Sequence, residues 1–173
     1  LLQILYHNTY KVKSTIFLNS LHTTFTLAKP ILVLKFGTAS ITTTKGELDE
    51  IVIGEIARQV ALIHKDYNLV IVSSGAVAAG KKFLKNYGGT LNEKKAAASI
   101  GNPLLLNTYA KYFSPHGIAI AQSLCERHHF SNRDQFLQLK RTYEELWNSD
   151  IIPIANENDV VSNLELKFSD NDE

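Results

Sequence analysis

The sequence of 173 residues has no methionine, one cysteine and only four prolines. With Cys125 alone, neither an internal disulfide nor a cysteine-rich metal site can form, so a reducing, cytoplasmic location is the default. No apolar run approaches the ~20 residues that span a bilayer, and the sequence therefore predicts no transmembrane segment. Because methionine is absent, we expect that Leu1 is not the initiating residue of a complete product.

Acidic charge is missing from the front of the chain. Through Gly46 there are five lysines and no acidic residue, and the remaining 13 basic residues and all 17 acidic ones follow. Nucleic-acid binding needs clustered positive charge, which this distribution does not offer. A small cationic or amphoteric ligand, or an anion bound together with a metal, suits the acidic second part better.

Residues 1–29 differ from the rest in being free of acids and rich in Ser, Thr and Asn. They show neither sustained helical periodicity nor a long strand pattern, and they lack the basic start and the roughly 7–15-residue apolar stretch of a secretory signal. The absence of acidic residues leaves a transit peptide possible, although transit peptides are rich in arginine and this segment has none. We expect a loosely ordered leader over residues 1–29 and one domain over residues 30–173.

From Pro30 onward, short apolar runs alternate with segments of helical periodicity. Strands are expected at residues 31–34, 68–72, 117–121 and 151–154. Helices are expected at residues 48–63, 76–87, 93–113 and 132–148, with Thr90 or Asn92 as the cap of the third. This alternation predicts a parallel α/β sheet with helices on both faces, which binds ligands beyond the carboxyl ends of its strands.

Polar clusters follow three of the predicted strands, at residues 35–38, 73–75 and 156–159. In the first, Lys35 precedes Gly37 and Thr38, and a lysine beside a glycine turn can aim an ammonium and backbone N–H groups at a phosphate. A strand that leaves its sheet with a solvated lysine is the alternative, which the local residues favour.

The second cluster partly matches two known motifs and satisfies neither. Gly75 and Gly80-Lys81 have the spacing of a P-loop, but Lys82 stands where Ser or Thr must reach magnesium. Ser74 is not in a nucleophile elbow, because that motif requires glycine where Val72 stands. What remains is a glycine turn that opens a helix and can hold a carboxylate or phosphate, or a purely structural turn.

The third cluster places Asn156, Glu157, Asn158 and Asp159 directly after a strand, and residues 170–172 repeat this chemistry as Asp-Asn-Asp. The spacing of these residues excludes an EF-hand loop. Each cluster is either part of a ligand-binding site or a solvated loop. Adjacent histidines such as His128 and His129 lack metal-ligand spacing, so we expect no protein metal site.

Taken in order, these clusters resemble glutamate 5-kinases of the amino acid kinase family. The matching segments are residues 33–38, 71–80, 96–101, 152–159 and 165–172. The most specific piece pairs Ile-Pro-Ile-Ala-Asn-Glu-Asn-Asp with Lys-Phe-Ser-Asp-Asn-Asp at close spacing. The resemblance implies an αβα sandwich that uses ATP and Mg²⁺ to phosphorylate the side-chain carboxylate of L-glutamate, the first step of proline biosynthesis. It also implies a homo-oligomer, while the charge distribution and the short apolar runs predict no nucleic-acid or membrane partner for this part.

The resemblance also implies roles for individual residues. Lys35, the catalytic candidate, would contact the ATP phosphates together with Gly37 and Thr38. Glutamate would be held by the substrate-binding candidates Ser74, Gly75, Asp159 and Asn171. Asn156 and Asp172 are further candidates for the same pocket. A carboxylate nucleophile is ionised at pH 7, so the chemistry requires no general base and no catalytic histidine or cysteine.

Two departures from the family pattern affect these expectations. Ser169 stands where the family usually has glycine. The chain also ends where the family continues into its nucleotide-binding half, so we expect the fragment alone to be inactive. Two alternatives stay open: an aspartate or acetylglutamate kinase of the same fold, and a non-catalytic amino-acid-binding module.

Overall fold

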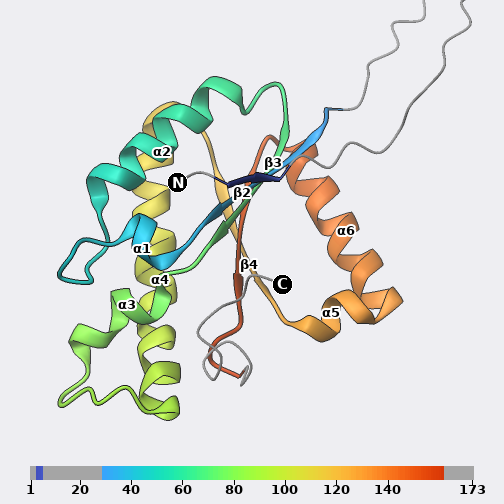
Figure 1. Ribbon diagram of the computed structural model, residues 1–173. Helices are drawn as coiled ribbons and strands as arrows, with labels where there is room; N and C mark the ends of the chain where they lie inside the picture. Colours follow the sequence, from blue (N-terminus) through green and yellow to red (C-terminus); the bar gives the residue numbers. More distant parts are fainter. Residues whose placement is uncertain (1–2, 6–28, 162–173) are drawn as a thin grey trace, which may run out of the picture.

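The computed structural model describes residues 3–5 and 29–161, which fold around one five-stranded sheet (Figure 1). Its strand order is β1-β2-β3-β5-β4. The strands are β1 (Gln3–Leu5), β2 (Ile31–Phe36), β3 (Asn68–Ser73), β4 (Ile120–Cys125) and β5 (Ile152–Glu157). All neighbouring pairs are parallel except β1 and β2, which pair antiparallel. The predicted mainly parallel sheet is therefore confirmed, and β1 is an addition that the sequence pattern did not indicate.

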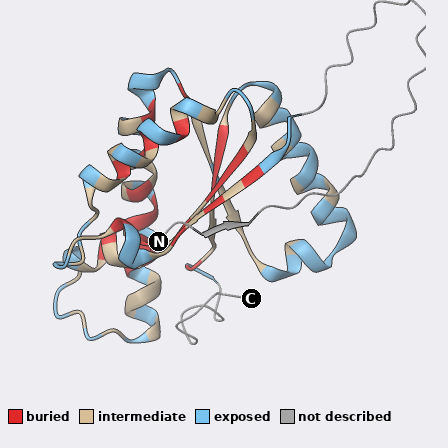
Figure 2. Ribbon diagram, turned by 45° about the horizontal axis from the view of Figure 1, so that its top comes forward, coloured by how far each residue is buried: buried red, intermediate tan, exposed pale blue. Residues whose placement is uncertain are grey.

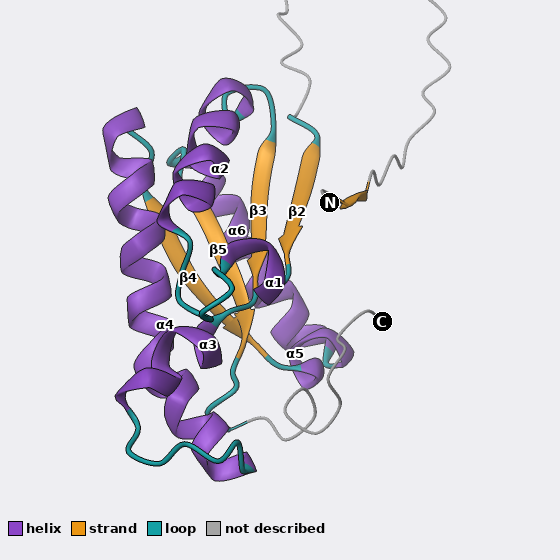
Figure 3. Ribbon diagram, turned by 60° about the vertical axis from the view of Figure 1, so that its left-hand side comes forward, coloured by secondary structure: helices purple, strands orange, loops and turns teal. Residues whose placement is uncertain are grey.

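Helices cover both faces of this sheet, which confirms the predicted sandwich (Figure 3). The helices are α1 (Thr38–Ile41), α2 (Glu50–Ile63), α3 (Ala76–Gly80), α4 (Leu91–Phe113), α5 (Arg127–Ser131) and α6 (Arg133–Asn148). Two short 3-10 turns, η1 (Lys81–Phe83) and η2 (Ser114–His116), complete the set. Helices α2, α3 and α4 lie on one side, and α5 and α6 lie on the other. Within the described part, no helix is long and apolar enough to cross a membrane.

The start of the longest helix, α4, is set by a capping box. The Thr90 hydroxyl accepts from the Glu93 backbone N–H, and the Glu93 carboxylate accepts from the Thr90 N–H at 2.8 Å. These bonds satisfy two backbone donors that a helix start leaves open. The same backbone hydrogen bond lowers the pKa of Glu93 below its ordinary value. Thr90, rather than Asn92, is thus the cap.

Two predicted elements have different bounds in the structure. The helix predicted over residues 76–87 ends at Gly80 and continues only as the 3-10 turn η1. Asn86, within the predicted range, has a positive φ of 56°, which a right-handed helix cannot include. The strand predicted over residues 117–121 begins at Ile120, because Gly117 ends η2 in the left-handed region at φ 69°. Helices α1 and α5 were not predicted, since four or five residues are too few to show periodicity.

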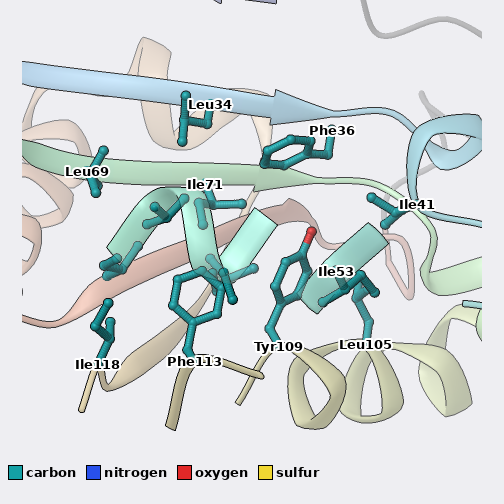
Figure 4. Close-up of a cluster of buried hydrophobic side chains, with 14 of the residues drawn as sticks. Leu34, Phe36, Ile41, Ile53, Leu69, Ile71, Leu105, Tyr109, Phe113 and Ile118 are labelled. Carbon is teal, nitrogen blue, oxygen red and sulfur yellow. The ribbon is translucent and has the colours of Figure 1, made fainter. Parts of the chain in front are cut away.

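The hydrophobic core lies between the sheet and helices α2 and α4 (Figures 2 and 4). Alternate residues of the strands point to this side, including Leu34 and Phe36 of β2 and Ile71 of β3, and they meet Ile53 of α2 and Phe113 of α4. Helix α6 on the other side has no fully buried residue. The strands are therefore positioned mainly by packing against α2 and α4, on one face of the sheet.

Candidate functional site

The three polar clusters lie at one edge of the sheet, because β2, β3 and β5 are parallel neighbours and each cluster follows a carboxyl end (Figure 1). Phe36 pairs with Ser73 in register, and Val72 pairs with Ala155. The ends of β2 and β3 are joined further on by a hydrogen bond of 3.0 Å from the Ser74 N–H to the Phe36 carbonyl. The sequence prediction that these clusters share the carboxyl edge is confirmed.

The turn after β3 depends on Gly75. This residue has φ 105° and ψ −2° and is the N-terminal cap of α3. L-residues with a side chain rarely adopt such a φ, and a Cβ here would also lie 3.0 Å from the Ile41 side chain. Gly75 itself is buried, whereas the preceding Ser74 is partly exposed at the edge. The chain thus makes a sharp glycine turn from strand to helix at the predicted position.

Lys35 lies near the end of β2 and is partly buried. Its neighbours Leu34 and Phe36 belong to the core cluster, so strand alternation directs Lys35 to the opposite face of the sheet, next to Val72 of β3. Gly37 follows with an extended backbone (φ −72°, ψ 161°), which any residue can adopt.

Within residues 3–5 and 29–161, no atom would lie within 4 Å of a Cβ at Gly37. Thr38 is exposed and is the first residue of α1. The described backbone therefore does not require glycine at position 37, and a ligand group could approach the main chain there more closely than at a residue with a side chain.

The end of β5 carries a hydrogen-bonded amide pair and a buried acid. The side-chain N–H of Asn156 donates to the Asn102 Oδ1 at 3.2 Å, and the Asn156 Oδ1 accepts from the Glu157 N–H at 2.9 Å. Asp159 follows in a turn and is only 6% exposed. Its position after β5, at the end of the sheet where parallel α/β proteins bind ligands, makes Asp159 a candidate for contacting a cationic group of a ligand.

Sequence reasoning did not single out Asn102 and Tyr109 of α4, and it included Ser73 of β3 only as a member of the second polar cluster. All three are buried behind this edge. Among the described residues, the buried Asn102 Nδ2 has no hydrogen-bond partner, while the Asn102 Oδ1 accepts from Asn156. The Tyr109 hydroxyl lies 2.9 Å from the Ser73 Oγ. A signal was available, because Asn102 interrupts the apolar stripe of Ala98, Leu105 and Tyr109 on one face of α4.

Several predictions concern residues beyond this edge. Asn171, Asp172 and Ser169 lie outside the described residues. His129 accepts a hydrogen bond of 2.8 Å at Nδ1 from the Glu126 N–H, so its ring caps α5. Among residues 3–5 and 29–161, no three His, Cys, Asp or Glu side chains are placed to hold a metal ion.

Parallel α/β sheets bind ligands beyond the carboxyl ends of their strands, and this is where the chain carries its glycine turn and its buried acid. The chain belongs to the amino acid kinase family, which matches residues 30–173. This match covers the whole described domain from β2 onward.

Curated relatives are similar over most of the chain. Glutamate 5-kinase 1 of Bacillus licheniformis is 41% identical over 151 residues, which cover 84% of this chain and 41% of that protein. The glutamate 5-kinase of Pelobacter propionicus is 39% identical over 82% of this chain and 39% of that protein. The glutamate 5-kinase of Haemophilus influenzae is 37% identical over 83% of this chain and 40% of that protein. The chain thus spans about two fifths of the length of these relatives.

Proposed function

We propose that this chain is the glutamate-binding part of a glutamate 5-kinase, which transfers the γ-phosphoryl group of ATP to the side-chain carboxylate of L-glutamate. The observation that carries the proposal is the strand-end arrangement, in which the Ser74–Gly75 turn and the buried Asp159 follow neighbouring parallel strands. The names of the relatives support the same reaction.

The chemistry that this edge would perform is positioning and charge neutralisation. Asp159 would pair with the substrate ammonium, and Ser74 and the Gly75 N–H would hold a carboxylate. Lys35, with the main chain at Gly37 and Thr38, would neutralise charge on the phosphates. The attacking carboxylate is already ionised at neutral pH, so bringing two anions together is the principal task of the protein.

Magnesium would enter this site on ATP. Mg²⁺ keeps several waters and is usually bound by one or two carboxylates plus substrate phosphates. The described residues include no cluster of three metal ligands, and this suits a metal that is held mainly by the nucleotide phosphates. The ion would offset the negative charge between the two substrates.

Further parts of the proposal rest on the family resemblance. Asn156 would support the same pocket from the end of β5, and Asn171 and Asp172 would complete it. The complete enzyme would act in the cytoplasm as a homo-oligomer, in the first step of proline biosynthesis.

The test is an assay of the full-length gene product with ATP, Mg²⁺ and hydroxylamine, which traps an acyl phosphate as a hydroxamate. L-Glutamate should give a hydroxamate, and aspartate and N-acetylglutamate should give far less. Preference for either of the latter would assign another kinase of this family. Glutamate binding by calorimetry with neither ATP binding nor hydroxamate would indicate an amino-acid-binding module.

The substitution Asp159→Asn is expected to weaken the binding of glutamate much more than the binding of ATP. Loss of the charge–charge hydrogen bond should raise the KM for glutamate by about 10- to 100-fold, since such bonds contribute roughly 1.5–3 kcal/mol. The KM for ATP should stay within about twofold. Asp66→Asn, an exposed residue between α2 and β3, is the matched control and should behave like the wild type. Equal increases in both KM values would contradict the assigned role of Asp159.

A further inference from the structure

Two buried hydroxyl groups connect helix α4 to the turn that follows β3. Tyr109 is fully buried and Ser73 is 1% exposed. The Tyr109 Oη lies 2.9 Å from the Ser73 Oγ, which in turn donates to the Ser74 carbonyl at 3.1 Å. Figure 4 shows the Tyr109 ring among the core side chains, with its hydroxyl group directed toward the sheet. The three groups form a chain of hydrogen bonds from α4 to the substrate edge.

The direction of these hydrogen bonds follows from the proton count. Burial raises the pKa of Tyr109 to about 12, so its hydroxyl keeps its proton at neutral pH. A serine hydroxyl has one proton, and that of Ser73 is donated to the Ser74 carbonyl. The Tyr109 hydroxyl must therefore donate to the Ser73 Oγ, which fixes both the proton and the rotamer of Ser73.

The last bond in this chain orients a peptide group of the candidate site. The described residues contain no cis peptide bond, so the Ser74 carbonyl and the Gly75 N–H point in opposite directions across one plane. Holding the carbonyl toward Ser73 therefore directs the Gly75 N–H away from the core. Gly75 has no side chain to restrict this plane, so the hydrogen bond to the Ser74 carbonyl is a main constraint on its orientation.

We propose that Tyr109 is a positioning residue for glutamate: acting through Ser73, it fixes the Ser74–Gly75 peptide plane so that the Gly75 N–H is presented to the substrate carboxylate. This inference rests on the proposed function for its substrate. It assigns the orientation of the turn to a residue of α4 that does not itself contact the ligand. A buried hydroxyl pair that served only to satisfy polar groups in the core would affect stability alone.

Three variants of the full-length gene product separate these roles. Tyr109→Phe and Ser73→Ala should each raise the KM for glutamate by about tenfold, with the KM for ATP within about twofold. The double variant should be no worse than either single one, because both remove the same chain of bonds. Tyr112→Phe is the matched control: it removes a hydroxyl of the same helix that donates to exposed Glu50 at 2.7 Å, and its KM values should not change.

A second readout does not depend on the substrate. In ¹⁵N–¹H correlation spectra, the amide signal of Gly75 should shift in Tyr109→Phe and Ser73→Ala and should stay in place in Tyr112→Phe. A lower melting temperature with an unmoved Gly75 signal and an unchanged glutamate KM would overturn the inference. A shifted Gly75 signal in a protein that does not phosphorylate glutamate would support the positioning role and refute the proposed function.

Discussion

Substituting alanine for Gly101 is expected to lower the free energy of unfolding by about 3 kcal/mol or more, although alanine ordinarily stabilises a helix interior by about 1 kcal/mol over glycine. A Cβ at Gly101 would lie 1.7 Å from the Ala76 carbonyl oxygen, and one at Gly80 would lie 1.9 Å from the Ala97 carbonyl oxygen. Helices α3 and α4 therefore pack backbone against backbone. No side-chain rotation can relieve either clash, so the two helices would have to separate.

Urea unfolding of Gly101→Ala beside Ser99→Ala measures this effect. Ser99 is an exposed residue of the same helix, and its replacement should change the midpoint little. A Gly101→Ala protein that unfolds at the wild-type midpoint would contradict the close packing of α3 on α4. Because α3 begins at the Gly75 turn, separation of the helices should also raise the glutamate KM of the complete enzyme.

This packing explains why the glycines of the second cluster resemble a P-loop without being one. Gly75 is needed for a positive φ at the turn, and Gly80 is needed for contact with α4. The sequence alone correctly rejects the P-loop, because Lys82 replaces the magnesium-binding hydroxyl. It could not identify the role of Gly80, since that role depends on Gly101 in a different helix.

The strands and the site edge could be predicted because their signals are local. Continuous apolar runs mark β2, β3 and β5, and the polar residues that follow them necessarily share one edge once the strands are parallel. The start of β4 was misplaced because Ile118 is a core residue that precedes the strand. Burial without sheet hydrogen bonds gives the same apolar pattern as a strand.

The supporting residues of the site could not be predicted, because their roles arise from contacts between distant segments. Tyr109 reads as an ordinary core aromatic residue, and only the fold shows its hydroxyl beside Ser73. Asn102 reads as a helical polar residue, and only the fold places it beside Asn156. Pairing of side chains across elements is a tertiary property that periodicity does not encode.

Lys35→Ala is expected to reduce the kcat of the full-length gene product by about 10²- to 10³-fold while leaving the KM for glutamate within about threefold. The ammonium would stabilise charge that develops on the transferring phosphoryl group, and it would contribute little to holding glutamate. Lys35 lies near the carboxyl end of β2, on the sheet face opposite the core and two residues before Gly37. Lys35→Arg, which keeps the charge, should retain more turnover than the alanine variant.

Lys29→Ala provides the matched control, because Lys29 precedes the same strand at its other end and forms an exposed ion pair with Asp150. Removing that surface pair should leave kcat unchanged, since exposed pairs contribute little to stability. Steady-state kinetics with glutamate and ATP varied separately would decide the matter. Equal losses in kcat and in glutamate affinity for Lys35→Ala would assign this lysine to glutamate binding, and the phosphate role would then have to come from another residue of the edge.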